Sequence, residues 1–342
     1  MAIRVLTVDD SILFRTVIKN EFAKIDDIDI IDTAANAMEA EEKIMRLNPD
    51  VVTMDVEMPG MNGIDFIKSF IPKKRVPFIV ITSSPTRAFD AISAGAVEFL
   101  KKPIVQNSSS MSAFTERLAS IIRFCSKANV RSAPTRPISA PQNSSLLTLG
   151  GSTHTNSIIA LGASTGGTDA LIEVVKRLPK NSPPVVIVQH MPAGFTKMYA
   201  ERLDKLCAMD AKEAEDGDRL RPGLIVVGAG DYHLRLQKDA RGYYVTSKHG
   251  EKVSGHCPSV DVLFESVAET AGPHAVGAIL TGMGADGAEG LLKMRKRGAY
   301  TIGQNEATCV VYGMPGVAFK IGAVMKQLPL EKIAEEIISK VK

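Results

Sequence analysis

The sequence predicts an α/β protein with two domains, each built on a doubly wound, mainly parallel sheet. Short apolar runs alternate with helical patterns in both halves of the chain, as βα units do. A segment rich in Ser, Pro, Asn and Thr, without helical or strand periodicity, separates the halves. The length of 342 residues also favours two hydrophobic cores over one.

The separating segment sets the predicted domain boundaries. From residue 128 to residue 154 the chain carries too little apolar surface to offset the entropy of ordering it. We therefore interpret it as an interdomain linker that is semi-stiff at its prolines. The expected domains are residues 1–127 and residues 155–342.

Four apolar runs in the first half have the length of buried strands, and polar residues follow each of them. The runs are Ile3–Val8, Asp50–Met54, Phe78–Ile81 and Val97–Leu100. Helical patterns cover Ala37–Leu47 and Ser112–Phe124, where apolar residues recur on one face. The alternation predicts a parallel sheet that is covered on both faces.

Polar side chains should meet where these strands end, because ligands bind at that edge of such sheets. Asp9, Asp10 and Asp55 would converge there, and three like charges need a cation. Oxygen ligands suit a hard ion such as Mg²⁺. Lys102 could balance a further anion, which Thr82 could hydrogen-bond. The alternative is that the two adjacent aspartates only cap the helix that follows, and that Lys102 lies in an ordinary loop.

The second half repeats the alternation of strands and helices. Its expected strands are Ser157–Ala160, Val185–Val188, Leu224–Val227 and Ala275–Leu280, with a hairpin of Tyr232–Leu236 and Tyr243–Ser247. A helix should begin at Thr168, and another should follow the last of these strands. The apolar stripe of the C-terminal helix, Leu330, Ile333, Ile337 and Val341, predicts a face docked on the domain.

Three strand ends in this half carry reactive side chains. Ser164 stands in a G-x-S-x-G turn after the first strand, where a nucleophile is expected. His190 follows the second strand, and Asp286 follows the strand that begins at Ala275. An alcohol, an imidazole and a carboxylate at one edge can serve as nucleophile, base and orienting group. Their order along the chain differs from the Ser, acid, His order of ordinary α/β-hydrolases.

A hydrolytic site of this kind needs donors for an oxyanion. The helix that opens after Ser164 and Thr165 presents unpaired backbone N–H groups. The glycine-rich turn at Met283 and Gly284 could supply another. The remaining histidines match no metal-ligand spacing, and we assign them no role.

Each of the three reactive residues also has a structural interpretation. Ser164 could be the N-cap of a helix in a phosphate-binding loop, His190 an ordinary core or surface histidine, and Asp286 the cap of the following helix. Two further functional classes stay open, a nucleotide-binding module and a non-enzymatic signalling adaptor. The first is weak because neither dinucleotide-binding nor P-loop glycine patterns are present.

Composition excludes several classes of protein. A net charge of +3 is too small to favour nucleic acid as a partner. No apolar run is long enough to span a bilayer and no secretory leader opens the chain, so we expect a cytoplasmic protein without membrane insertion. The four cysteines are far apart, which argues against a disulfide framework or a CxxC site.

Residues 1–127 resemble the receiver domain of two-component response regulators, which has a flavodoxin-like fold. The resemblance rests on Asp9-Asp10, Asp55 before Val56-Glu57-Met58-Pro59-Gly60, Thr82 and Lys102-Pro103. It implies that Asp55 accepts a phosphoryl group from a chemotaxis histidine kinase. It also implies that Mg²⁺ is held by Asp9, Asp10, Asp55 and the backbone of Glu57, and that Thr82 and Lys102 form the switch.

The whole chain is similar to the chemotaxis response-regulator protein-glutamate methylesterases, the CheB family. The supporting segments are 162–167, 189–192, 281–287, 304–315 and 258–261. The resemblance implies a Rossmann-like methylesterase domain with a Ser-His-Asp triad. It implies that glutamyl methyl esters of methylated chemoreceptors are the substrates, that some receptor glutamines are deamidated, and that the unphosphorylated receiver inhibits the esterase.

Two positions depart from the family pattern. Cys257 stands where arginine is expected, and Gly228-Ala229-Gly230 replaces the usual Ala-Pro-Gly. Neither position belongs to the proposed triad, so we expect any effect to fall on the grip of the substrate.

Overall fold

The computed structural model describes residues 2–103, 108–126 and 156–341. The chain forms two compact units, residues 1–135 and 136–342, and each is described by itself. The predicted linker, residues 128–154, lies outside the described residues, so the predicted domain boundaries stay predictions.

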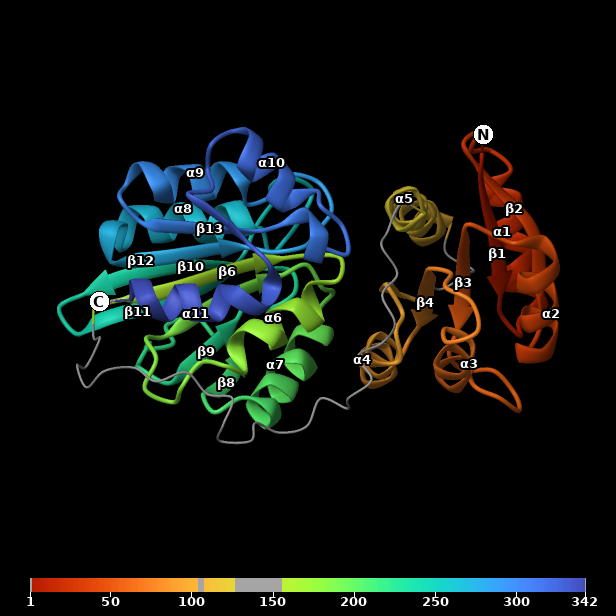
Figure 1. Ribbon diagram of the computed structural model, residues 1–342, viewed down its shortest axis with the longest axis horizontal. Coiled ribbons are helices and arrows are strands. Elements are labelled where there is room, and N and C mark those ends of the chain that lie inside the picture. Colours follow the sequence, from red (N-terminus) through yellow and green to blue (C-terminus); the bar gives the residue numbers. More distant parts are fainter. Residues whose placement is uncertain (1, 104–107, 127–155, 342) are drawn as a thin grey trace. The chain divides into compact units, whose positions relative to one another are not determined.

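The first unit is an α/β sandwich (Figure 1). Its strands are β1 (Ile3–Val8), β2 (Ile28–Ala34), β3 (Val51–Asp55), β4 (Phe78–Thr82) and β5 (Glu98–Lys101). Its helices are α1 (Ile12–Phe22), α2 (Ala37–Leu47), α3 (Gly63–Phe70), α4 (Pro85–Ser93) and α5 (Ser108–Cys125). The strands run parallel in the order β2-β1-β3-β4-β5. This is the flavodoxin-like order, which confirms the fold predicted for this half.

The strand β2 was not predicted from the sequence, whereas α2 has the predicted bounds. Aspartates interrupt the apolar residues of β2, so the run does not read as a buried strand. The strand lies at the edge of the sheet and pairs with a neighbour on one side only. The register pairs Val8 with Met54, so the residues after β1 and β3 lie side by side.

The second unit contains a larger parallel sheet and a separate hairpin. The strands of the sheet are β6 (Ile158–Ala163), β7 (Val185–Gln189), β8 (Asp210–Glu213), β9 (Leu224–Val227), β12 (Ala275–Ile279), β13 (Tyr300–Gln304) and β14 (Lys326–Leu328). They run parallel in the order β14-β13-β12-β6-β7-β9-β8. The antiparallel hairpin consists of β10 (Tyr232–Asp239) and β11 (Gly242–His249), as predicted.

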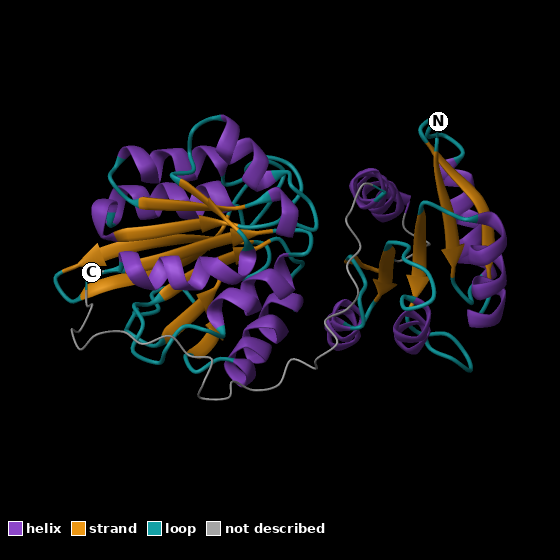
Figure 2. Cartoon of the chain, in the orientation of Figure 1, coloured by secondary structure: helices purple, strands orange, loops and turns teal. Residues whose placement is uncertain are grey.

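Helices cover both faces of this sheet (Figure 2). They are α6 (Gly167–Val175), α7 (Phe195–Leu206), α8 (Val260–Thr270), α9 (Ala288–Lys296), α10 (Met314–Lys320) and α11 (Leu330–Lys340). Figure 1 shows α6, α7 and α11 on one face and α8, α9 and α10 on the other. Two-sided cover explains why β6, β7 and β12 are buried along their whole length. The predicted doubly wound, Rossmann-like architecture is confirmed.

The C-terminal helix α11 packs its apolar stripe against the domain. Ile333 and Ile337 are fully buried, and the helix lies against α6 and β13. In the described part of the chain, no helix has the length and apolarity needed to cross a membrane.

Candidate active site

The three reactive residues predicted from the sequence follow adjacent strands of the larger sheet. β6 lies between β7 and β12, where the direction of strand addition reverses. Ser164 follows β6 directly and His190 follows β7 directly, and the His190 N–H donates to the carbonyl of Ala163 at 3.3 Å. Asp286 lies in the loop that leaves β12. In open α/β sheets this reversal point is where ligands bind.

The turn at Ser164 is held by its backbone. Its N–H donates to the Thr281 carbonyl at 3.0 Å, and its carbonyl accepts from the Gln189 side chain at 2.8 Å. A Cβ at Gly167 would lie 2.1 Å from Gln189 Oε1, so only glycine permits this packing. The hydroxyl of Ser164 does not cap α6, whose N-cap is Gly166 without a side-chain bond. The interpretation of Ser164 as a helix cap is therefore wrong.

Gly282 forms the floor beneath Ser164. A Cβ at Gly282 would lie 2.9 Å from the Ser164 Cβ and 2.3 Å from the Met314 sulfur. The neighbouring Thr281 hydroxyl donates to the Thr165 carbonyl at 2.9 Å and accepts from the Val311 N–H at 3.0 Å. These bonds tie the serine turn to the loops that leave β12 and β13.

Asp286 is the most heavily bonded side chain of the site. Its Oδ2 accepts from His190 Nε2 at 2.7 Å and from the Val260 N–H at 2.7 Å. Its Oδ1 accepts from the Ser259 hydroxyl at 2.7 Å and from the Asp261 N–H at 3.0 Å. The carboxylate thus sits at the N-terminus of α8, where the helix dipole favours negative charge. Asp286 does not cap the helix that follows it, as the structural alternative held, because the N-cap of α9 is Gly287.

These donors set the charge of Asp286. Burial alone would raise the pKa of this carboxyl group, but hydrogen bonds from His190 and Ser259 and the backbone N–H of Asp261 lower it to about 2. The neighbouring Asp261 has a raised pKa, mainly because burial desolvates its charged form. Asp286 is therefore ionised at neutral pH.

The ionised carboxylate fixes the tautomer of His190. A carboxylate only accepts hydrogen bonds, so Nε2 carries the proton and Nδ1 carries the lone pair. Nδ1 is buried and has no hydrogen-bond partner among residues 2–103, 108–126 and 156–341. This orientation is the reverse of the chymotrypsin arrangement, in which Nδ1 faces the acid and Nε2 faces the serine. His190 is 8% exposed, and its hydrogen bond to Asp286 shows that it is not a surface histidine; its role as the base stays a prediction.

The predicted oxyanion donors belong to the serine turn itself and to the loop after β12, whose Gly282 packs against Ser164. Thr165 is buried, Met283 is half-buried and Gly284 is exposed with a φ of +80°. The backbone of the Gly282–Gly284 turn is packed against Gly313, whose hypothetical Cβ would lie 3.0 Å from the Gly284 nitrogen. Their role as donors stays a prediction.

Sequence reasoning missed two histidines of this region. The His256 ring is stacked on the His190 ring, with centroids 3.7 Å apart and planes 5° apart. His233 accepts from the Ser259 N–H at 3.4 Å and contacts the Glu251 carbonyl at 2.7 Å. The spacing of these residues along the chain gives no signal, because the hairpin and a tight turn bring them to the site.

The departures from the family pattern lie beside the site. The Cys257 carbonyl accepts from the Asp231 N–H at 3.2 Å, and burial raises the pKa of the Cys257 thiol. Gly230 is required by packing, because its Cβ would lie 2.3 Å from the Ala193 nitrogen. A Cβ at Gly228 would lie 3.3 Å from a methyl carbon of Val188, a tight contact that a small shift of that side chain could relieve.

A second polar cluster lies at the strand ends of the first unit. Lys102 Nζ lies 2.5 Å from Asp55 Oδ2 and 2.7 Å from Asp9 Oδ2. Burial raises the pKa of Asp9 to about 6, an effect that Lys102 opposes and the nearby charge of Asp55 reinforces. Burial would lower the pKa of Lys102, but its bonds to Asp55 and Asp9 raise it.

The carboxylates of this cluster fit a divalent cation. Oxygen atoms of Asp9, Asp10 and Asp55 lie within 4.8 Å of one another. Asp9 and Asp55 are buried, so a cation would offset the cost of burying two like charges. Glu57 lies beside them, and its N–H donates to Asp55 Oδ1 at 3.1 Å.

The surroundings of Thr82 and the N-cap of α1 bear on the interpretations made from the sequence. Thr82 is fully buried, and its hydroxyl accepts from the Ser84 N–H at 3.1 Å. The N-cap of α1 is Ser11, so the adjacent aspartates are not the capping residues, as the alternative held. The Ser11 N–H donates to Asp9 Oδ1 at 2.9 Å, which orients that carboxylate.

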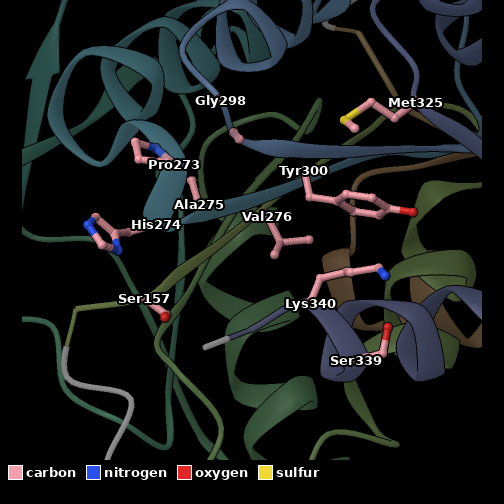
Figure 3. A pocket seen from close by; sticks show the side chains of 11 residues that line it. Ser157, Pro273, His274, Ala275, Val276, Gly298, Tyr300, Met325, Ser339 and Lys340 are labelled. Atoms are coloured by element: carbon pink, nitrogen blue, oxygen red, sulfur yellow. The ribbon is translucent and has the colours of Figure 1, made fainter.

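A separate cavity of about 370 Å³ lies at the opposite, amino-terminal edge of the larger sheet (Figure 3). Its lining includes His274, Tyr300 and Lys340, with the Lys340 ammonium 5.0 Å from the centre of the Tyr300 ring. It shares no residue with the group around Ser164.

Comparisons with known proteins agree with this two-part architecture. The family model for the response regulator receiver domain matches residues 5–111, and the CheB methylesterase model matches residues 159–337. The catalytic domain of Thermotoga maritima CheB methylesterase superimposes with a TM-score of 0.53 at 39% identity, covering 54% of this chain and 98% of that chain.

Full-length relatives cover both parts. The protein-glutamate methylesterase/protein-glutamine glutaminase 2 of Syntrophomonas wolfei is 46% identical over 98% of this chain and 96% of its own. The protein-glutamate methylesterase/protein-glutamine glutaminase of Escherichia coli K12 is 42% identical over 99% and 97%, respectively. The chain belongs to the CheB methylesterase family, which confirms the resemblance seen in the sequence.

Replacing Gly282 by alanine should displace Ser164. The new methyl group would overlap the Ser164 Cβ and the Met314 sulfur, and a misplacement of ~1 Å can cost about 100-fold in rate. We expect kcat/KM for ester hydrolysis to fall about 100-fold or more. Gly228→Ala is the control, since its methyl group would meet only the flexible Val188 side chain, at 3.3 Å. Equal losses in both variants would contradict the role of Gly282.

Replacing Asp286 by asparagine should disable His190 and loosen α8. An amide can donate to Nε2 and so stabilise the wrong tautomer, which costs on the order of 10⁴-fold in kcat. The free energy of unfolding should fall by about 1–3 kcal/mol, since buried donors lose their acceptor. The exposed ion pair of Asp210 makes Asp210→Asn a control that should change neither quantity.

Asp286→Asn should also make the free energy of unfolding depend less on pH in acid solution. The pKa of Asp286 in the folded protein, about 2, lies below its ordinary value of 3.8. Its stabilisation is therefore complete above about pH 4 and is lost as the pH falls toward 2. Denaturant unfolding between pH 5 and pH 2 should show a steeper loss for the wild type than for Asp286→Asn, and parallel curves would refute the assigned shift.

Proposed function

We propose that the chain is a phosphorylation-regulated serine hydrolase that removes methyl groups from glutamyl methyl esters of chemoreceptors and deamidates receptor glutamines. The printed activities of its full-length relatives support both reactions. The observation that carries the proposal is the Asp286–His190 pair, which follows strands adjacent to β6, the strand before Ser164, and which leaves Nδ1 of His190 without a hydrogen bond.

The first half of the reaction forms an acyl-enzyme. Ser164 Oγ attacks the ester carbonyl while its proton moves to His190 Nδ1. The imidazolium that forms is stabilised in the plane of the ring by the Asp286 carboxylate. The tetrahedral intermediate collapses, the bond to the methoxy group breaks, and methanol leaves with the proton from His190.

The second half restores the enzyme. His190 takes a proton from water, whose oxygen attacks the acyl carbon, and Ser164 leaves with that proton to give free glutamate. Deamidation follows the same path with ammonia as the first leaving group. Backbone N–H groups near Thr165, Met283 and Gly284 are the proposed oxyanion donors, each worth about 3 kcal/mol in the barrier.

The first unit supplies regulation. Asp55 is the proposed phosphoryl acceptor from a chemotaxis histidine kinase, and Lys102 would pair with the added charge, as it pairs with Asp55 here. Asp9, Asp10, Asp55 and the Glu57 backbone would hold Mg²⁺, which supplies charge neutralisation during phosphoryl transfer. The buried Thr82 hydroxyl accepts from the Ser84 N–H here, and on phosphorylation it would turn and donate to the phosphoryl group.

The proposal includes inhibition of the esterase by the unphosphorylated receiver. A difference of a few kcal/mol between closed and open states changes the closed fraction by about 100-fold. Within the described ranges the four cysteines form no disulfide with one another, which supports a reducing, cytoplasmic setting. The alternatives of an adaptor or a nucleotide-binding module are not favoured by the family.

Ser164→Ala tests the hydrolase itself. Methanol release from methylated receptor membranes should fall by a factor on the order of 10⁶, because the nucleophile is lost. The thermal unfolding midpoint and receptor binding should persist. Undiminished methanol release would exclude Ser164 as the nucleophile and with it the proposed mechanism.

Truncation and Asp55→Asn test the regulation. Removing residues 1 to about 150 should raise basal methanol release, and a small-molecule phosphodonor should activate the full-length chain but not Asp55→Asn. A fragment no faster than the unphosphorylated full-length protein would contradict inhibition by the receiver.

A further inference from the structure

The face of the His190 ring is covered by a second imidazole. His256 stacks on it with centroids 3.7 Å apart and an interplanar angle of 5°. In the plane of the His190 ring, Nε2 is bonded to Asp286, and Nδ1 has no hydrogen bond and is the proposed base. The stack therefore adds a contact perpendicular to the plane in which proton transfer is proposed.

A tight turn places His256 in this position. Val253 and His256 exchange two backbone hydrogen bonds, and the residues between them, Ser254 and Gly255, have φ values of 53° and 81°. Two central residues with positive φ are the mark of a type I′ turn. The Ser254 carbonyl lies 2.8 Å from His256 Nδ1, so it accepts from that nitrogen and fixes the ring.

The turn is braced on the structure that holds Asp286. The Ser254 hydroxyl lies 3.3 Å from Asp261 Oδ2, in the first turn of α8. The His233 ring packs against Gly250, where a Cβ would lie 2.8 Å away, and reaches the Glu251 carbonyl. A strained, non-glycine φ at Ser254, held by several bonds, is typical of functional segments.

The stacked geometry argues against a metal-binding role for this pair. Potential ligand atoms of His190, His256 and Asp286 lie within 4.8 Å of one another. The lone pairs of an imidazole lie in the plane of its ring, however, and two parallel planes direct them side by side instead of toward one ion. Both oxygens of Asp286 are already bonded to protein donors.

We propose that His256 is a positioning residue for the catalytic base of the hydrolytic reaction. Its ring blocks rotation of the His190 imidazole about the Cβ–Cγ bond, which Asp286 alone restrains through one nitrogen. Its π-face also lies against the cation that forms when Nδ1 takes the serine proton, and aromatic faces stabilise cations. Because this charge exists only after proton transfer, the contribution appears in kcat.

Three substitutions at His256 separate a flat aromatic face from mere volume. His256→Phe retains a planar ring, His256→Leu retains comparable apolar volume without one, and His256→Ala removes both. We expect kcat for methanol release to fall about tenfold in the leucine and alanine variants with KM unchanged. The phenylalanine variant should keep kcat within about threefold of the wild type.

The turn provides a second test that leaves the histidine in place. Gly255→Ala adds a methyl group with no atom within 4 Å, but it strains a φ of +81° and should shift His256. Gly242→Ala is the matched control, since it has a φ of +109°, equally open space, and a position at the far end of the hairpin. Only Gly255→Ala should lower kcat.

The outcomes are distinct. Wild-type kcat in His256→Ala, or equal losses in the phenylalanine and leucine variants, would overturn the positioning role. A change confined to KM would instead assign His256 to substrate binding and would also overturn it. Failure of the wild type to release methanol above Ser164→Ala would refute the proposed function itself. Thermal unfolding of each variant shows whether a loss of kcat reflects global destabilisation.

Discussion

The candidate active site depends on a single buried carboxylate that satisfies donors from different parts of the chain. Asp286 binds His190 at the end of β7 and the first residues of α8, whose orphan N–H groups would otherwise be buried without partners. His190, the Ser259 hydroxyl and the backbone N–H of Asp261 together lower the pKa of the carboxyl group against the effect of burial, and the resulting carboxylate accepts a hydrogen bond from Nε2 of His190. The same carboxylate thus binds the N-terminus of α8 and orients the His190 ring, so a substitution of Asp286 affects both.

In the first unit a single charged group also joins several partners, but there it is a cation that binds carboxylates. There the buried groups are two aspartates, and Lys102 bridges them from the end of β5. The raised pKa of Asp9 shows that one cation does not fully offset the cost of burial. A further cation would offset more of that cost, and Lys102 lies beside Asp55, the residue proposed to accept the phosphoryl group.

The sequence was sufficient to predict the residues that follow strands. Ser164, His190 and Asp286 were identifiable because apolar runs mark strands and parallel strands end at one edge. The edge strand β2 escaped because aspartates interrupt its apolar pattern, and β13 (Tyr300–Gln304) escaped because Thr and Gly dilute its pattern. The partner of Asp286 at α8 lies more than twenty residues away along the chain, and the contact of His256 depends on a turn. Such contacts depend on tertiary packing, which no local period encodes.

The orientation of the His190 ring has a mechanical consequence. Nδ1 is bonded to Cγ, whereas Nε2 lies at the far side of the ring. A base that acts through Nδ1 is therefore closer to the main chain than one that acts through Nε2. Small errors in side-chain torsion move it less than they would move the distal nitrogen. The alignment of the proposed nucleophile, Ser164, with the proposed base, His190, would then depend largely on the ladder between β6 and β7, which pairs Ala163 with Gln189 one residue before each of them. In this member of the CheB family, the sheet would therefore set how accurately the proposed reacting pair is aligned.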